Sequence, residues 1–136
     1  MDMRFILILF LSISLIKAKS QQIVEIYSNS FLEKDVKLST KIIADHIEKD
    51  SIILFDNGTY ENFYSYSFFD EFGNSKITGN YYKKDSTIYL RPLKEYYSEN
   101  WIRDVSNYSE IPCEIINEKL DCFKEYRKIK FLEKQR

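Results

Sequence analysis

Short apolar runs alternate with turn signals from Ser51 to Pro92, a pattern typical of antiparallel strands joined by tight turns. The run Ser51–Phe55 precedes the sequence Asp-Asn-Gly, and the run Thr59–Tyr66 follows it with residues that suit a pleated, half-buried surface. Asp-Asn-Gly predicts a three-residue loop in which Gly58 adopts the positive φ that side chains with a Cβ avoid. The segment therefore predicts a β-hairpin over residues 51–66.

A second hairpin is predicted between Lys76–Tyr82 and Thr87–Arg91, with the polar residues Lys83–Ser86 as its turn. The polar loop of residues 70–75 connects the two hairpins. Directly opposed residues share one face of a sheet, so the register decides which side chains are buried. Pairing outward from the two turns predicts these apolar pairs: Leu54 with Tyr60, Tyr81 with Ile88, and Gly79 with Leu90.

Three turn motifs follow one another along this segment: Asp-Asn-Gly-Thr-Tyr at 56–60, Thr-Gly-Asn-Tyr at 78–81, and Lys-Asp-Ser-Thr-Ile-Tyr-Leu at 84–90. Their order resembles the pattern of small lipocalin-like exported proteins of gram-negative bacteria. Those proteins commonly carry Asp-Gly-Thr-Phe, Gly-Thr-Trp and Gly-Asp-Thr-Leu-Leu at comparable places. This chain departs from them in Tyr60, in Asn80-Tyr81 and in the inserted Ser86. The resemblance implies a β-meander or barrel and says little about a ligand, since its motifs are turn chemistry.

The chain as a whole is expected to be mostly β, an antiparallel meander of six to eight strands with one short helix. It would form a sheet or a lipocalin-like half barrel. Ile23–Tyr27 suits a first strand, and a short strand or turn of helix is expected around Trp101–Val105. Side chains alternate over residues 127–132, which predicts a final edge strand with its lysines outward; a basic patch for a polyanion is the alternative.

The segment before the meander carries the apolar stripe of a short amphipathic helix. The stripe consists of Leu38, Ile42, Ile43, His46 and Ile47, with Ser39 or Thr40 as the N-cap. The alternative is a further strand over Lys41–Ile47, since isoleucine also suits a strand. We expect the helix, lying against or capping the sheet.

Residues 1–20 have the pattern of a secretory signal peptide, with Arg4 before the apolar run Phe5–Ile16 and a small-x-small site at Ala18-Lys19-Ser20. Cleavage is expected before Gln21. As a helix the apolar run would span about 18 Å, too short for the roughly 30 Å hydrocarbon core of a bilayer. We therefore expect residues 21–136 to form a single β-rich domain that is secreted or periplasmic, without a transmembrane anchor.

The two cysteines are placed to form a disulfide across a hairpin. With a two-residue turn at Asn117-Glu118, Cys113 falls opposite Cys122 in a non-hydrogen-bonded pair, where the Cα separation is within disulfide range. The even number of cysteines and the export signal agree with this bond, which would contribute roughly 2 to 3 kcal/mol. The alternative is a pair of reduced, buried thiols.

The tyrosines are the candidate ligand-binding residues. Tyr60, Tyr64 and Tyr66 alternate onto the face predicted to be inward, with Tyr81 across the sheet. They either fill a core or line a cavity that stacks a sugar or an apolar ligand. Trp101, in the long connection between residues 93 and 110, is either a core plug or part of the same ligand platform.

The resulting functional hypothesis is a small-ligand or carbohydrate-binding module, with an accessory envelope protein acting by protein–protein contact as the alternative. With 20 Lys and Arg against 21 Asp and Glu, the charge is too balanced to indicate a nucleic acid partner. His46 is the single histidine and has no acidic or histidine partner at ligand spacing, so neither a metal nor a cofactor is expected. No catalytic motif places a nucleophile, and we do not expect an enzyme.

Overall fold

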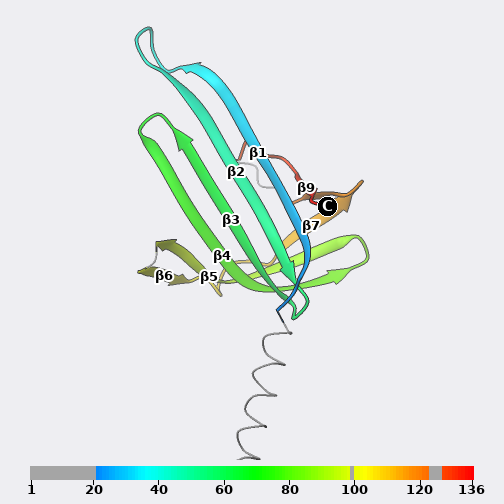
Figure 1. The fold of residues 1–136 in the computed structure, drawn as a ribbon. Helices are drawn as coiled ribbons and strands as arrows, with labels where there is room; N and C mark the ends of the chain where they lie inside the picture. The colour runs from blue at the N-terminus through cyan, green and yellow to red at the C-terminus, as the bar shows by residue number, and fades with distance from the viewer. Residues whose placement is uncertain (1–20, 99, 123–126) are drawn as a thin grey trace, which may run out of the picture.

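The computed structural model describes residues 21–98, 100–122 and 127–136, and these residues form strands and no helix (Figure 1). The predicted signal peptide, residues 1–20, lies outside the described residues. The strands are β1 (Ile23–Lys37), β2 (Ile43–Phe55), β3 (Thr59–Phe68), β4 (Glu71–Lys84), β5 (Thr87–Ser98), β6 (Trp101–Asp104), β7 (Ile111–Ile116), β8 (Lys119–Asp121) and β9 (Leu132–Lys134).

The strands close into an antiparallel barrel. Their order is β4-β3-β2-β1-β9-β8-β7-β5-β6, and β4 also pairs with β5, which joins the ends of an eight-stranded cylinder. Strand β6 is an extra strand that pairs with β5. The predicted mostly-β meander is confirmed and is consistent with a lipocalin-like fold, although the barrel is closed rather than half open.

The predicted helix over residues 38–47 is wrong. The chain turns at residues 38–42, where the Leu38 N–H donates to the Ile42 carbonyl at 3.0 Å, and it continues as β2 from Ile43. The alternative of a strand is the correct one for residues 43–47. Residues 43–47 form a strand because they pair with β1. The apolar side chains of the predicted helix are largely exposed in the structure, so a helix would have no core against which to pack them.

The first predicted hairpin is confirmed. Leu54 lies opposite Tyr60, Gly58 has a φ of 81°, and its N–H donates to the Phe55 carbonyl at 3.2 Å. The short strand expected around Trp101 is also present, as β6.

The predicted register of the second hairpin is wrong by two residues. The turn is the two-residue Asp85-Ser86, with Asp85 at a φ of 56°, so Tyr81 lies opposite Leu90 rather than Ile88. Gly79 accordingly lies opposite Pro92 rather than Leu90. Because the shift is an even number of residues, the same side chains still face the core.

The predicted cysteine hairpin is confirmed in its register and its bond. Ile115 lies opposite Leu120, and Cys113 forms a disulfide with Cys122 across a Cα separation of 4.1 Å. Asn117 and Glu118 have φ values of 50° and 63°, the sign that both central residues of a type I′ turn require.

The predicted edge strand over residues 127–132 is wrong. Residues 127–131 are irregular, and the strand that follows, β9, lies between β8 and β1 inside the closed sheet. Arg127 and Ile129 are buried while Lys128 and Lys130 are exposed. The alternation therefore reflects a segment packed against the barrel rather than an edge.

Two tyrosine–glycine pairs shape the sheet between β3 and β4. Tyr60 lies opposite Gly79, and Tyr66 lies opposite Gly73. At Gly79 the register with β5 shifts, and a Cβ there would collide with the backbone carbonyl of Arg91 and with the Tyr60 ring. At Gly73 a Cβ would lie 2.6 Å from the Tyr66 ring. Each ring occupies space that only a glycine leaves.

These contacts predict different costs for two matched substitutions. Gly79→Ala should lower the free energy of unfolding by about 3 kcal/mol, because the clash is with backbone that cannot move independently. Gly73→Ala should cost about 1 kcal/mol, since the half-exposed Tyr66 ring can rotate away. Urea unfolding of both variants checks this, and equal costs would contradict it.

The segment between β5 and β7, which contains β6, is bound to the barrel through Glu110. Its carboxylate accepts hydrogen bonds from Arg91 Nε and from the Tyr82 hydroxyl, both at 2.7 Å. Arg91 also lies over the Tyr82 ring, which stacks on Tyr89. The hydrogen bonds from Arg91 and then from Tyr82 hold the pKa of Glu110 below its usual range.

The lowered pKa of Glu110 predicts a pH dependence. A depressed carboxyl pKa adds stability above the unfolded-state value of about 4.3, and that stability is lost as the pH falls through the folded-state value. Glu110→Gln should therefore lower the melting temperature at neutral pH, and its difference from the unsubstituted protein should shrink below about pH 4.3. Thermal unfolding with Glu71→Gln as the control checks this; a difference that stays constant down to about pH 3 would contradict it.

Candidate functional site

The predicted tyrosines point into the barrel, but they do not line one shared cavity. Tyr60 is 2% exposed and belongs to the hydrophobic core, and Tyr81 packs against that core while its hydroxyl donates to the Phe55 carbonyl at 2.7 Å. Burial raises the pKa of the Tyr60 hydroxyl. Tyr64 binds a carboxylate, and Tyr66 covers Gly73. The part of the predicted site near Tyr60 and Tyr81 is therefore filled.

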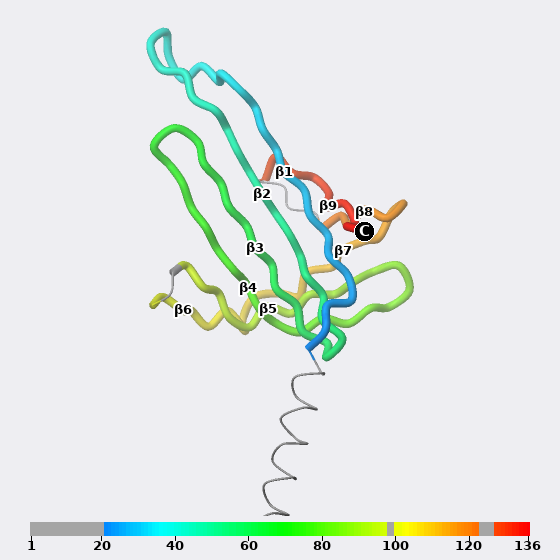
Figure 2. The backbone as a smooth tube through the Cα atoms, viewed as in Figure 1, coloured from blue at the N-terminus to red at the C-terminus, as the bar shows by residue number. Residues whose placement is uncertain are grey.

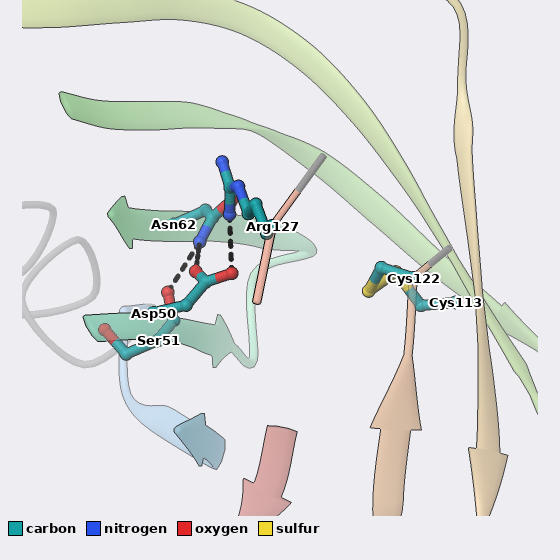
Figure 3. Close-up of a disulfide and its surroundings, with 6 residues drawn as sticks. All are labelled: Asp50, Ser51, Asn62, Cys113, Cys122 and Arg127. Carbon is teal, nitrogen blue, oxygen red and sulfur yellow. Dashed lines mark hydrogen bonds and ion pairs between the residues drawn. A yellow bond between two sulfur atoms is a disulfide. The ribbon is translucent and has the colours of Figure 1, made fainter. Parts of the chain in front are cut away.

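A buried charged cluster lies beside this core (Figure 3). Arg127 is 6% exposed, and its Nη1 donates to Asp50 Oδ2 at 2.5 Å. The other oxygen of Asp50 accepts from Asn62 Nδ2 at 2.6 Å. The guanidinium lies 3.6 Å from the Tyr64 ring centroid, and the Tyr64 hydroxyl donates to Glu48 at 2.6 Å. Burial first, and then the bond to Glu48, raise the pKa of Tyr64.

Residues 127–131 cover this cluster. The Lys128 N–H donates to Glu48 at 2.8 Å, and Asn29 Nδ2 donates to the Phe131 carbonyl at 3.0 Å. With Arg127 bound to Asp50, residues 127–131 thus contact β1 and β2 from the inside. The acids of this cluster act as a structural anchor for the end of the chain.

A depression of about 720 Å³ lies on the outer face of the sheet. Its floor is formed by two rows of opposed residues on β1–β4, one containing Ser51 and Phe63 and the other containing Lys49 and Ser65. Both rows face away from the barrel interior, because they alternate with the row of the buried residues Tyr27 and Ile52. The residues that line it are Ser28, Asn29, Ser30, Lys49, Asp50, Ser51, Phe63, Tyr64, Ser65, Asn74, Ser75, Glu133 and Gln135.

The depression combines hydroxyl and amide groups with one accessible aromatic ring. Phe63 is 40% exposed and lies between Ser51 and Lys76 in the same row. Lys76 Nζ is 5.9 Å from the Phe63 ring centroid. Lys49 stands in the neighbouring row, and it makes no ion pair with the residues that the structure describes. The site can therefore stack one face of a ligand and hydrogen-bond its edges.

Trp101 is not a core plug. Its side chain is 71% exposed and lies against Tyr97, with the ring centroids 6.1 Å apart, and it does not line the depression. Val105, which follows β6, is fully buried. The hypothesis that Trp101 shares one platform with the four tyrosines therefore has no contact to support it.

His46 lies between two aromatic rings rather than among ligands. Its ring centroid is 5.5 Å from that of Phe31 and 4.9 Å from that of Phe68. Residues 21–98, 100–122 and 127–136 contain no cluster of His, Cys, Asp and Glu that could hold a metal ion. Within the same ranges, no helix is of a length and hydropathy that would cross a bilayer.

Comparison with known protein families, with characterised proteins and with solved structures finds no match to this chain.

Sequence reasoning missed both the outer depression and the inner anchor. No local pattern marks the depression, because Ser28, Ser51 and Phe63 come from three strands and meet only through the order of β1–β4 across the sheet. The signal for the anchor was an acid in phase with the core, since Asp50 continues the inward series of Ile52 and Leu54. Arg127 could not be assigned to it, because the two are 77 residues apart.

The anchor predicts a large cost for removing one of its partners. Asp50→Ala should lower the free energy of unfolding by about 3 to 5 kcal/mol, because it removes the carboxylate that binds the buried Arg127 guanidinium and the Asn62 amide. The double variant Asp50→Ala/Arg127→Ala should cost less than the sum of the single variants. Urea unfolding measures all three, with the outward-facing Glu61→Ala as the control. A cost for Asp50→Ala within about 0.5 kcal/mol of the control would contradict the anchor.

Proposed function

We propose that this protein is a carbohydrate-binding module whose ligand lies in the outer depression over β1–β4. The observation that carries the proposal is the half-exposed Phe63 ring set among serine hydroxyls in a recess of about 720 Å³. Sugars present an apolar C–H face and a rim of hydroxyl groups. An aromatic ring next to small donors and acceptors is complementary to both.

The composition of the recess favours a polar ligand over an apolar one. Ser28, Ser30, Ser51 and Ser65 provide hydroxyl groups, and Asn74 and Gln135 provide amides. A recess for a lipid or a haem-like compound would instead be lined mainly by apolar side chains. The volume falls within the range of about 300 to 1,000 Å³ typical of small-molecule sites.

We also propose that the protein is exported and that it is related to a known family. The disulfide Cys113–Cys122 supports an oxidising compartment, because such bonds are rare in the cytosol. The closed antiparallel barrel supports relationship to the small lipocalin-like exported proteins of gram-negative bacteria that the turn motifs resemble. In this proposal residues 1–20 direct secretion or transport to the periplasm.

A second candidate function is that of an accessory protein acting by contact with another protein. It is favoured by the apolar side chains of Leu32, Ile47 and Phe72, which are exposed in one row on the outer face of the long strands. Large exposed apolar groups in a row are typical of contact surfaces.

Screening the protein against an oligosaccharide array and measuring the selected sugars by calorimetry tests the carbohydrate proposal. Phe63→Ala should weaken binding about tenfold, equivalent to about 1.4 kcal/mol, because the stacking surface is lost. Phe72→Ala is the matched control, since it removes another exposed phenylalanine outside the depression. An array without bound sugars, or equal affinities for both variants, would overturn the proposal.

A further inference from the structure

The strands β1–β4 form an arm that extends beyond the closed part of the barrel (Figure 2). Strand β1 pairs with β9 only at Tyr27 and Ser28, and β4 pairs with β5 only from Lys76 onward. Ser30–Lys37 of β1 and Glu71–Ser75 of β4 therefore each have one side without a partner strand among the described residues. An open strand side is a template for pairing with another chain.

The open side of β1 carries several devices that discourage such pairing. The Ser30 N–H donates a hydrogen bond to the side chain of Asn29 at 2.8 Å, so it is not available to a partner strand. A register shift follows Glu33, where Asp35 has a φ of 55° and its N–H donates to Asp45 at 3.1 Å. Bulges, charges and capped donors are features by which natural proteins protect sheet edges.

The open side of β4 has neither a bulge nor a capped donor, and its one charged residue is Glu71. Its pairing with β3 is regular from Glu71 to Lys76, without a bulge, a proline or a capping side chain in the described residues. Hydrogen-bonded and non-hydrogen-bonded pairs alternate along an antiparallel ladder, and the pair that flanks the two-residue turn, Phe68 with Glu71, is hydrogen-bonded. It follows that Phe72 and Asn74 direct their backbone N–H and C=O groups to the open side.

The edge carries one large apolar side chain, Phe72, among polar neighbours. Phe72 is 79% exposed and continues the outer row that contains Leu32 and Ile47. Beyond Tyr96, β5 diverges from β4 and folds back as β6 (Figure 1), where Trp101 is exposed. Strand β5 therefore does not extend alongside Glu71–Ser75, and a further strand could pair with β4 there.

We propose that the β4 edge binds an extended peptide segment of another protein by strand addition. The peptide runs antiparallel to β4, in line with β5, and pairs its backbone with Phe72 and Asn74. It carries an apolar side chain beside Phe72. In strand addition the backbone hydrogen bonds supply affinity, and alternate side chains supply specificity.

Other occupants fit the edge less well. A lipid surface would cover Phe72 but would leave the backbone groups of β4 without hydrogen-bond partners, at a cost of several kcal/mol each. A second copy fits only a poorer register: an antiparallel pairing about Gly73 sets each Phe72 opposite a polar Asn74, and one about Phe72 is limited to residues 71–73, because Asn74 would then lie opposite the turn residue Asp70. An extended peptide satisfies both the backbone groups and Phe72.

The test selects binders from a displayed library of random peptides about eight residues long and measures synthetic copies of the selected sequences by calorimetry. Asn74→Pro removes the outward N–H without removing a bond to β3, and Asn74→Ala removes the same side chain but keeps the N–H. We expect Asn74→Pro to weaken binding at least about tenfold and Asn74→Ala to change it less than about twofold. Circular dichroism and thermal unfolding establish that both variants fold.

Amide hydrogen exchange by NMR provides an independent readout on the unsubstituted protein. On adding a selected peptide, the amides of Phe72 and Asn74 should become protected, while those of Gly73 and Ser75, which already face β3, should not change. Failure to select any peptide, equal binding to both Asn74 variants, or protection elsewhere would overturn the proposal. Dimerisation that Asn74→Pro abolishes would also overturn it, by assigning the edge to a second copy. None of these outcomes depends on whether a sugar binds over Phe63.

Discussion

The ion pair between Arg127 and Asp50 is the contact on which closure of the barrel depends. It joins the end of the chain to the middle of β2 across 77 residues, and both groups are almost fully buried. The strand that follows, β9, contacts β1 at only two registered positions. So short a ladder supplies little stability by itself, and the buried anchor beside it holds the two sides of the sheet together.

The same anchor explains why the interior offers little room for a ligand. Arg127 covers the Tyr64 ring, Phe131 is bound through its carbonyl to Asn29, and Tyr60 fills the space over Gly79. The groups that a ligand could reach therefore lie outside the barrel, in the depression around Phe63 and along the open edge of β4. The outer surface of the filled barrel is therefore where we propose that ligands bind.

Much of the local structure could be predicted from particular residues. Gly58 located the first hairpin, and the spacing of Cys113 and Cys122 located both a turn and a disulfide. The helix over residues 38–47 was predicted incorrectly because isoleucines at these spacings satisfy helical and extended patterns alike, and only pairing with β1 decides between them. Of the predicted tyrosines, Tyr60 and Tyr81 are packed into or against the core, and Trp101 lies apart from the depression.

The amino-acid sequence by itself determined the hairpin at Gly58, the hairpin between the cysteines, and the parity that separates inward from outward side chains. These properties depend on φ preferences and on a two-residue period, and both act between near neighbours in the chain. Only the tertiary structure decided that β9 closes the barrel, that Arg127 meets Asp50, and that Phe63 lies in a recess with serines from other strands. Those contacts join residues far apart in sequence, so they are set by which strands lie side by side, and no local pattern encodes that order.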